Sequence, residues 1–170
     1  MAQFADQANR SAQALGRSTL DYTKASLTFY QQGLNDQDVQ ARTEATLKAQ
    51  NITGAGQEMA DYLTSVWNGY KVANEEAELY VDKLAAVADS SASHMSELAI
   101  AMSKVASTAH TMGVDVDQLN GMIATVVATT RQAPEAVGTA FKTIFSRMND
   151  IKAGAEDAEI SLGNYSGKMA

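Results

Sequence analysis

The residues of this sequence best suited to acid–base or metal chemistry are its two histidines, His94 and His110. A zinc hydrolase of the H-E-x-x-H type needs a second histidine four residues after the first, so that both project from one helix face beside a glutamate. Neither histidine has such a partner here. We therefore interpret both as surface or helix-capping residues.

A short acidic run, DVDQLNG at 115–121, invites comparison with a calcium-binding loop. An EF-hand needs an oxygen ligand at position 5, glycine at position 6 and a bidentate glutamate at position 12. Leu119, Asn120 and Val126 occupy those positions. Capping of a helix by Asp115 explains the acids without a metal.

Phosphate binding and nucleophilic catalysis are not indicated either. Gly54 and Gly56 lack the third glycine of a dinucleotide-binding loop and follow no predicted strand. The sequence contains no Walker loop and no G-x-S-x-G nucleophile elbow. It has no cysteine for a disulfide or a thiolate metal site. We therefore expect no catalytic residues, no cofactor and no metal, and we expect that the protein is not an enzyme.

Composition and charge also limit the classes of protein to which the chain can belong. The chain has 170 residues, 45% of them hydrophobic and 19% charged, which is typical of a folded domain rather than a disordered segment. A formal net charge of −7 disfavours binding to nucleic acid, and we expect no sequence-specific nucleic-acid partner. No apolar run reaches about 18 residues, so no membrane span is predicted. The start, MAQFADQANR, lacks the features of a secretory signal peptide.

Charge is unevenly distributed along the chain. Residues 131–152 contain four basic and two acidic side chains, whereas Glu75, Glu76, Glu78 and Asp82 crowd one predicted helix. Each group is either a solvated helix face or a patch that docks on the other group or on a neighbouring copy.

Apolar residues recur at intervals of three and four positions along the chain. This spacing predicts that the residues discussed above lie on α-helices. We expect an all-α fold, a multi-helix bundle of stacked helical hairpins with about six to eight helices. The clearest stripe lies in the fourth helix and contains Met59, Tyr62, Leu63, Val66, Trp67 and Tyr70. Trp67, the single tryptophan, is predicted to be a buried anchor of the core rather than a contact for a partner.

Residues with turn and capping preferences set the predicted helix boundaries. Ser93 is expected to cap the sixth helix and Asp115 the seventh. Pro134 suits the first turn of the last helix, and Gly154 is expected to end that helix.

Two further predicted helices carry stripes at helical spacing. The second helix, at 19–32, is expected to carry Leu20, Thr23, Leu27 and Tyr30 along one side. The last helix is expected to use a stripe of Val137, Phe141, Ile144, Met148 and Ile151, widened by Ala140 and Phe145.

The domain organisation expected is a polar N-terminal arm at 1–17, a helical domain at 18–154 and a flexible C-terminal tail at 155–170. A weak internal repeat accompanies it, in which Met59, Leu63 and Trp67 correspond to Leu119, Ile123 and Val127. Both stacked hairpins and chance account for that repeat.

Residues 125–148, TVVATTRQAPEAVGTAFKTIFSRM, contain the pattern T-R-x-x-x-E-x-V-G-x-x-x-K-T-I-F-x-R. The residues that meet it are Thr130, Arg131, Glu135, Val137, Gly138, Lys142, Thr143, Ile144, Phe145 and Arg147. Upstream, LTSVWNGY, YVDKLAAVADSS, ELAIAMSKVASTAHTMGV and LNGMIATV follow in order. This succession of blocks, over about residues 20–154, resembles the helical domain of phage tail tape measure proteins. Pro134 departs from that family, which more often has serine or alanine before the acid.

The resemblance implies a structural role without catalysis. Tape measure proteins are long, mostly helical chains that occupy the lumen of a siphophage or myophage tail, set its length during assembly and leave it when DNA is ejected. The implied partners are the tail tube, the tail tip and assembly chaperones, together with self-association. The implied locations are the host cytoplasm during assembly and then the virion tail lumen. With 170 residues, the chain is expected to be an excised domain or a prophage remnant rather than a complete ruler.

Some roles of the motif residues follow from their chemistry. Gly138 has no side chain, so we expect it to let a neighbouring helix approach closely. Arg131, Lys142 and Arg147 are expected to bind the carbonyl ends of adjacent helices or an acidic partner.

Two other classes of protein are less consistent with the sequence. Trp67-Asn68-Gly69 is a W-x-G, the turn motif of small secreted helical-hairpin proteins that bind a partner protein. Those proteins carry a Y-x-x-x-D/E signal after the motif, whereas Tyr70 is followed four residues later by Asn74. A cell-wall hydrolase, which some long tape measures carry, would need a catalytic cluster that the sequence lacks.

Overall fold

The computed structural model describes the backbone of residues 2–166 and the side chains of residues 5–156. Over that backbone, the all-α prediction is confirmed, because the chain forms eight α-helices and one short 3-10 helix and has no strand. The elements are α1 (Ala2–Ala14), α2 (Thr19–Gln31), α3 (Asp36–Thr53), α4 (Glu58–Tyr70), η1 (Asn74–Glu76), α5 (Ala77–Ser90), α6 (Met95–Thr111), α7 (Val116–Thr130) and α8 (Pro134–Ser166).

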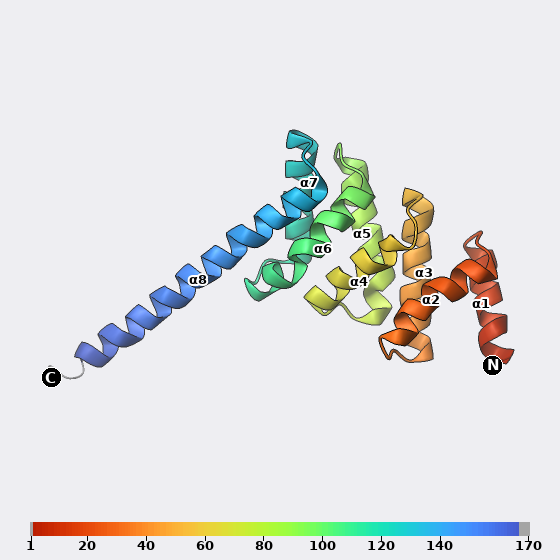
Figure 1. Cartoon of the computed structure of the whole chain (residues 1–170), viewed down its shortest axis with the longest axis horizontal. Coiled ribbons are helices and arrows are strands. Elements are labelled where there is room, and N and C mark those ends of the chain that lie inside the picture. Colours follow the sequence, from red (N-terminus) through yellow and green to blue (C-terminus); the bar gives the residue numbers. More distant parts are fainter. Residues whose placement is uncertain (1, 167–170) are drawn as a thin grey trace.

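The helices form an open stack of two layers. Figure 1 shows α1, α3, α5 and α7 in one row, with α2, α4, α6 and the start of α8 crossing them in a second row. Contacts join neighbours within a row, as between α3 and α5 or between α6 and α8, and consecutive helices across the rows. Each hairpin therefore packs on the hairpins before and after it, which is the organisation of a helical solenoid.

The repeating unit of this stack is one helical hairpin. Helices α4, α6 and α8 begin at Glu58, Met95 and Pro134, so the row has a nearly constant repeat of a length usual for solenoids. The weak repeat seen in the sequence instead relates α4 to α7, which lie in different rows. It is therefore not the repeat of the fold.

Short turns connect consecutive helices. Gly33, Gly54 and Gly113 lie after helix ends with positive φ, a conformation that glycine adopts without steric cost. Asp115 caps α7 as predicted, because its carboxylate accepts a hydrogen bond from the Asp117 amide.

The predicted cap of α6 by Ser93 is wrong. His94 is the N-cap there, since the Glu97 side chain reaches back to its backbone N–H. The Ser93 hydroxyl instead contacts that of Ser91.

The stripe noted along the second helix in the sequence is not the side that α2 turns to the core. Leu20 and Leu27 are 61% and 55% exposed, and the buried residues are instead Tyr22, Ala25, Ser26 and Phe29. Both stripes have helical spacing, but burying the stripe with two aromatic rings removes more apolar surface from water. The Phe29 ring lies 6.2 Å from that of Trp67 in α4.

Helix α1 is packed against the stack rather than detached from it. Ala8 and Ala12 are buried in a small cluster that also contains Tyr22, Ala25 and Leu47. Side-chain hydrogen bonds join α1 to α3, including Ser11 to Glu44 at 2.6 Å. Phe4, which precedes Ala8 by four positions in the sequence, lies outside the described side chains. The division at residue 17 stays a prediction.

The last helix is longer than predicted. Glycine in a helix interior costs only about 1 kcal/mol relative to alanine, and Gly154 lies between two alanines that favour helix. The expectation that Gly154 ends the helix is therefore wrong, and α8 continues to Ser166. In the described part of the chain, its C-terminal half extends away from the stack (Figure 1). The predicted flexibility of residues 155–170 is not tested by this.

Candidate functional site

The motif singled out in the sequence forms the joint between the stack and α8. Thr130 is the last residue of α7 and closes it with a hydrogen bond from its hydroxyl to the Val126 carbonyl, at 2.8 Å. Arg131 follows in the left-handed conformation, with φ of 55°. Pro134 then begins α8, where its fixed φ suits the first turn. The chain thus changes direction within a very short turn.

Arg131 attaches this turn to the preceding hairpin. Its guanidinium donates a hydrogen bond of 2.6 Å to the carbonyl of Ala92, which lies just beyond the end of α5. This is the type of carbonyl contact expected for the basic residues of the motif. A charged donor makes a stronger bond to such a carbonyl than a neutral one, so it helps to offset the cost of the left-handed backbone.

Gly138 lets α8 pack directly on α6. A Cβ at this position would collide with the carbonyl oxygen of Ala101, and the backbone carbons of Ala101 would lie only 3.0 Å away. Val137, beside it, is 2% exposed. The neighbouring helix thus approaches Gly138 as closely as the missing side chain permits.

The rest of the motif divides between the core and the surface. Phe145 is 7% exposed, and its ring lies 5.9 Å from that of the half-buried Phe141. By contrast, Ile144, Met148 and Ile151 of the same predicted stripe are exposed. The end of α6 instead lies beside Ser146, Asn149 and Asp150, on a different face of α8. The remaining exposed motif side chains on α8 are Glu135, Lys142, Thr143 and Arg147.

A second feature is a buried arginine that the sequence analysis did not find. Arg42 is 5% exposed, and its guanidinium carbon lies 5.2 Å from the centre of the Trp67 ring. It donates hydrogen bonds to the side-chain oxygens of Asn68 and Asn74 and to the carbonyl of Val72. Burial lowers the pKa of Arg42. A lone cation among the core-facing positions of α3 was the available sequence signal.

Trp67 itself is fully buried, as expected of a core anchor. It lies between Phe29 on one side and the Arg42 guanidinium on another, so it connects α2, α3 and α4. Burial at this position leaves the ring no surface to offer a partner.

Comparison with known families identifies the class of protein. A family model for phage-related minor tail proteins matches residues 5–170. The chain belongs to that family. No solved structure matches the chain.

This minor tail protein therefore has a structural role in a phage tail and belongs to the virion tail. That agrees with the assignment to a phage tail made from the sequence. Interaction with other tail proteins follows from the same family. Among the described residues, no helix is long and apolar enough to cross a membrane.

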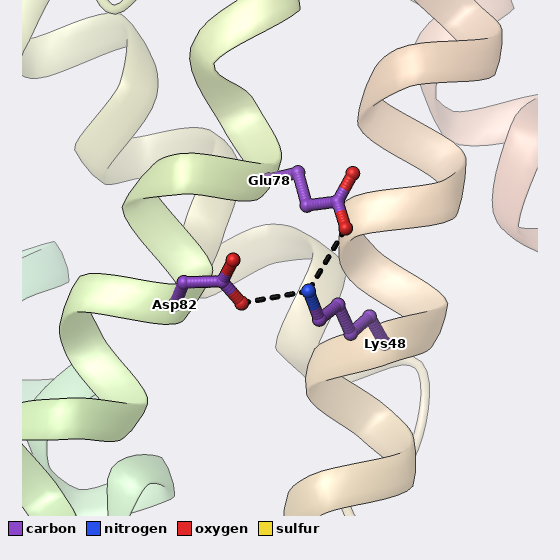
Figure 2. Close-up of polar contacts among 3 residues, drawn as sticks. All are labelled: Lys48, Glu78 and Asp82. Atoms are coloured by element: carbon purple, nitrogen blue, oxygen red, sulfur yellow. Dashed lines mark hydrogen bonds and ion pairs between the residues drawn. The ribbon is translucent and has the colours of Figure 1, made fainter.

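Ion pairs on the stack of the tail protein link one hairpin to the next. Lys48 of α3 lies between two carboxylates of α5, at 2.8 Å from Glu78 and 2.7 Å from Asp82 (Figure 2). Lys83 of α5 binds Asp117 of α7 at 2.7 Å. Part of the acidic group on the fifth helix is thus used within the chain. These exposed pairs contribute to the alignment of the hairpins more than to stability.

Of the two histidines considered for chemistry, His94 lines a groove, and the His110 ring lies 5.5 Å from that of Tyr70. Asp89, Ser93 and His94 line one groove of about 270 Å³. The Ser93 hydroxyl, however, contacts Ser91, and the backbone of His94 is engaged by Glu97. Within the described part of the chain, no three His, Cys, Asp or Glu side chains are grouped to hold a metal.

Proposed function

We propose that this chain is the helical domain of a phage tail tape measure protein, which acts as a structural and interaction module in tail assembly and in determining tail length. Its proposed partners are the tail tube, the tail tip and assembly chaperones. The proposed locations are the host cytoplasm during assembly and the tail lumen afterwards.

The observation that carries this proposal is the joint at 130–147. Arg131 and Gly138 fix the start of α8 against the preceding hairpin and α6, and the C-terminal half of this 33-residue helix extends beyond the stack. A straight α-helix rises 1.5 Å per residue, so α8 spans about 50 Å. A tape measure protein sets the length of the tail tube by its own length. A domain that fixes the direction of a long helix is consistent with that role.

The experiment that tests the ruler function lengthens this rod in the phage that encodes the chain. Inserting about 28 helix-forming residues after Lys152 adds four heptads, which keeps the stripe of α8 in phase, and lengthens the rod by about 42 Å. We expect longer tails by electron microscopy.

A matched insertion of the same residues at Gly16, in the turn after α1, extends no helix of the rod. It is expected to leave the tail length unchanged. Tails of normal length from both insertions would contradict the ruler function.

The alternative of a small W-x-G hairpin protein is not favoured by the position of the motif. Trp67-Asn68-Gly69 lies inside α4, not in a turn between two long helices. A Cβ on Gly69 would meet the backbone of Ser107 and the side chain of Ala106 in α6, so this glycine serves helix packing.

A further inference from the structure

The turns that follow α3, α5 and α7 lie along one edge of the stack (Figure 1). The last two of these turns are joined by Arg131, whose guanidinium donates to the carbonyl of Ala92. Arg131 lies three positions before the start of α8, and Ala92 lies three positions before the start of α6. The arginine therefore binds the residue at its own equivalent position in the preceding hairpin.

The first two turns are not joined in this way. Ala92 now stands where the arginine would be, and its equivalent in the preceding hairpin is Ala55, three positions before the start of α4. An alanine side chain has no donor and ends at Cβ. Between the end of α3 and the turn at 91–94 lies the groove of about 270 Å³. It is lined by Ile52, Thr53, Ala85, Ala88, Asp89, Ser93, His94, Met95 and Ser96.

The groove attracts positive charge. Asp89, which is exposed, is the one acid among the residues that line it, and no lysine or arginine is among them. Ile52 and Thr53 are the last two residues of α3. Carbonyls in the last turn of a helix have no donor within that helix and carry the negative end of its dipole. Two helices therefore supply acceptors for a cation.

The start of α6, which also lines the groove, does not reverse this preference. Free amides at a helix start favour an anion, but the Glu97 carboxylate already accepts the His94 amide at 2.9 Å. A further anion there would meet the charges of Glu97 and Asp89. The joint has the same arrangement, because Arg131 lies just before the start of α8.

The shape and lining of the groove match one long side chain. Its volume is below the roughly 300–1,000 Å³ of pockets that hold drug-sized ligands. Ala85, Ala88 and Met95 offer apolar surface, on which the methylene groups of a long basic side chain pack while its charged end stays among polar groups. A guanidinium has five donors in one plane, so it can bind a carboxylate and a carbonyl together, which suits arginine better than lysine.

We propose that the groove beside Asp89 binds an arginine side chain of a partner protein, with the guanidinium bonded to the Asp89 carboxylate and to the carbonyls at the end of α3. The partner supplies from outside the contact that Arg131 makes within the chain at the next hairpin. This contact does not depend on the tail-length function, so the insertion experiment and the tests below succeed or fail separately.

The first test titrates the whole chain with a short peptide, acetyl-Gly-Ala-Arg-Ala-Gly-amide, and follows the backbone amides by NMR. We expect shifts concentrated at Thr53, Asp89 and Met95, with a Kd of about 1–10 mM. Peptides with lysine or uncharged citrulline in place of the arginine are the matched controls. They are expected to bind at least about fivefold more weakly.

The second test changes the groove. Asp89→Asn removes the charged acceptor and is expected to raise the Kd of the arginine peptide about tenfold. The matched control is Asp61→Asn, which removes an exposed acid of α4 outside the groove and is expected to leave the Kd unchanged.

Ala92→Arg supplies the missing side chain from within the chain. Ala92 is exposed, so the longer side chain is tolerated there. We expect its guanidinium to occupy the groove, as Arg131 does at the next hairpin, and to abolish measurable binding of the peptide. Circular dichroism checks that each variant remains helical.

Four outcomes would overturn the proposal. One is the absence of shifts at the groove with peptide up to about 20 mM, since weaker binding would not support recognition. Another is equal binding of the citrulline peptide, and a third is a Kd that Asp89→Asn leaves unchanged. The fourth is preferred binding of a peptide with glutamate in place of the arginine, which would show an anion site at the start of α6.

Discussion

At the scale of single residues, Gly138 has the strictest steric requirement in the joint. We expect Gly138→Ala to lower the free energy of unfolding by about 1–3 kcal/mol, because the added methyl group would force α8 away from the Ala101 carbonyl. Gly121→Ala is the matched control, since that helical glycine faces open space. It is expected to gain up to about 1 kcal/mol through helix propensity. Urea denaturation of both variants measures the difference, and equal effects would contradict the packing role.

Arg42 supports a second prediction at this scale. Its planar guanidinium reaches three separate oxygens while it stacks on Trp67, and a lysine ammonium matches neither geometry. We expect Arg42→Lys to cost about 1–3 kcal/mol of unfolding free energy. The same change at the exposed Arg10 is expected to stay within about 0.5 kcal/mol. Chemical denaturation distinguishes the two, and a neutral Arg42→Lys would show that its hydrogen bonds contribute little.

Individual residues were predictable where one local rule applied. The burial of Trp67, the close approach at Gly138 and the cap at Asp115 each follow from a single side chain or its absence. Arg42 was missed because its partners, Asn68 and Asn74, are distant in the sequence. Spatial neighbours of that kind are set by the stacking of hairpins, which no local pattern encodes.

At the scale of elements, the cluster formed by α1, α2 and α3 is expected to respond to alkaline pH. Burial is the main reason that the pKa of Tyr22 rises to about 12 from its ordinary value of 10. The folded chain therefore retains a proton that the unfolded chain loses first, so stability is intact below about pH 10 and falls as the pH rises towards 12. The hydrogen bonds to Asp82 and Glu78 raise the pKa of Lys48, and the stability that Lys48 contributes is lost in the same direction.

Tyr22→Phe isolates one part of this effect. The phenyl ring keeps the buried surface and removes the ionisable hydroxyl, so we expect a shallower loss of stability between pH 10 and 12 than in the wild type. Some loss should remain, because burial also raises the pKa values of Tyr70 and Tyr80. Denaturation midpoints from pH 7 to 12 measure this, and identical slopes for both proteins would contradict it.

Helix positions were more predictable than helix faces. In α4 a single strong stripe was present, and it is the buried one. In α2 two stripes competed, and the buried one packs on residues of other helices, with Phe29 beside Trp67 and Tyr22 in the cluster with α1 and α3. For α8 the spacing of the stripe was evident, but the extent of its burial depended on how far the stack continues beside the helix.

At the scale of the whole molecule, the buried side chains of residues 5–156 form two clusters of unequal size. The smaller one contains mainly alanines around Tyr22 and Leu47, whereas the larger one runs from Phe29 to Phe145 through Trp67. In a solenoid, stability is a sum over neighbouring repeats, so a weak end can open by itself. The fold class was predictable from periodicity, but the hairpin repeat was not, because successive hairpins fill equivalent positions with different side chains.

Native-state hydrogen exchange is expected to reveal this division. Backbone amides of α1 and of the first half of α2 should exchange faster than those of α4 and α6, which have larger buried side chains on several sides. Mass spectrometry of exchanged peptides measures the protection of each helix. Uniform protection from α1 to α6 would show instead that the stack opens as a single unit.

Because each hairpin packs chiefly on its neighbours, the fold also determines how the molecule would respond to tension. If the two ends were pulled apart, the load would fall on one hairpin at a time. Each hairpin that yields would release roughly 40 residues of chain, or roughly 130 Å of extended length. The stack would thus lengthen in similar steps at modest force, and it would fold back hairpin by hairpin when the load is removed.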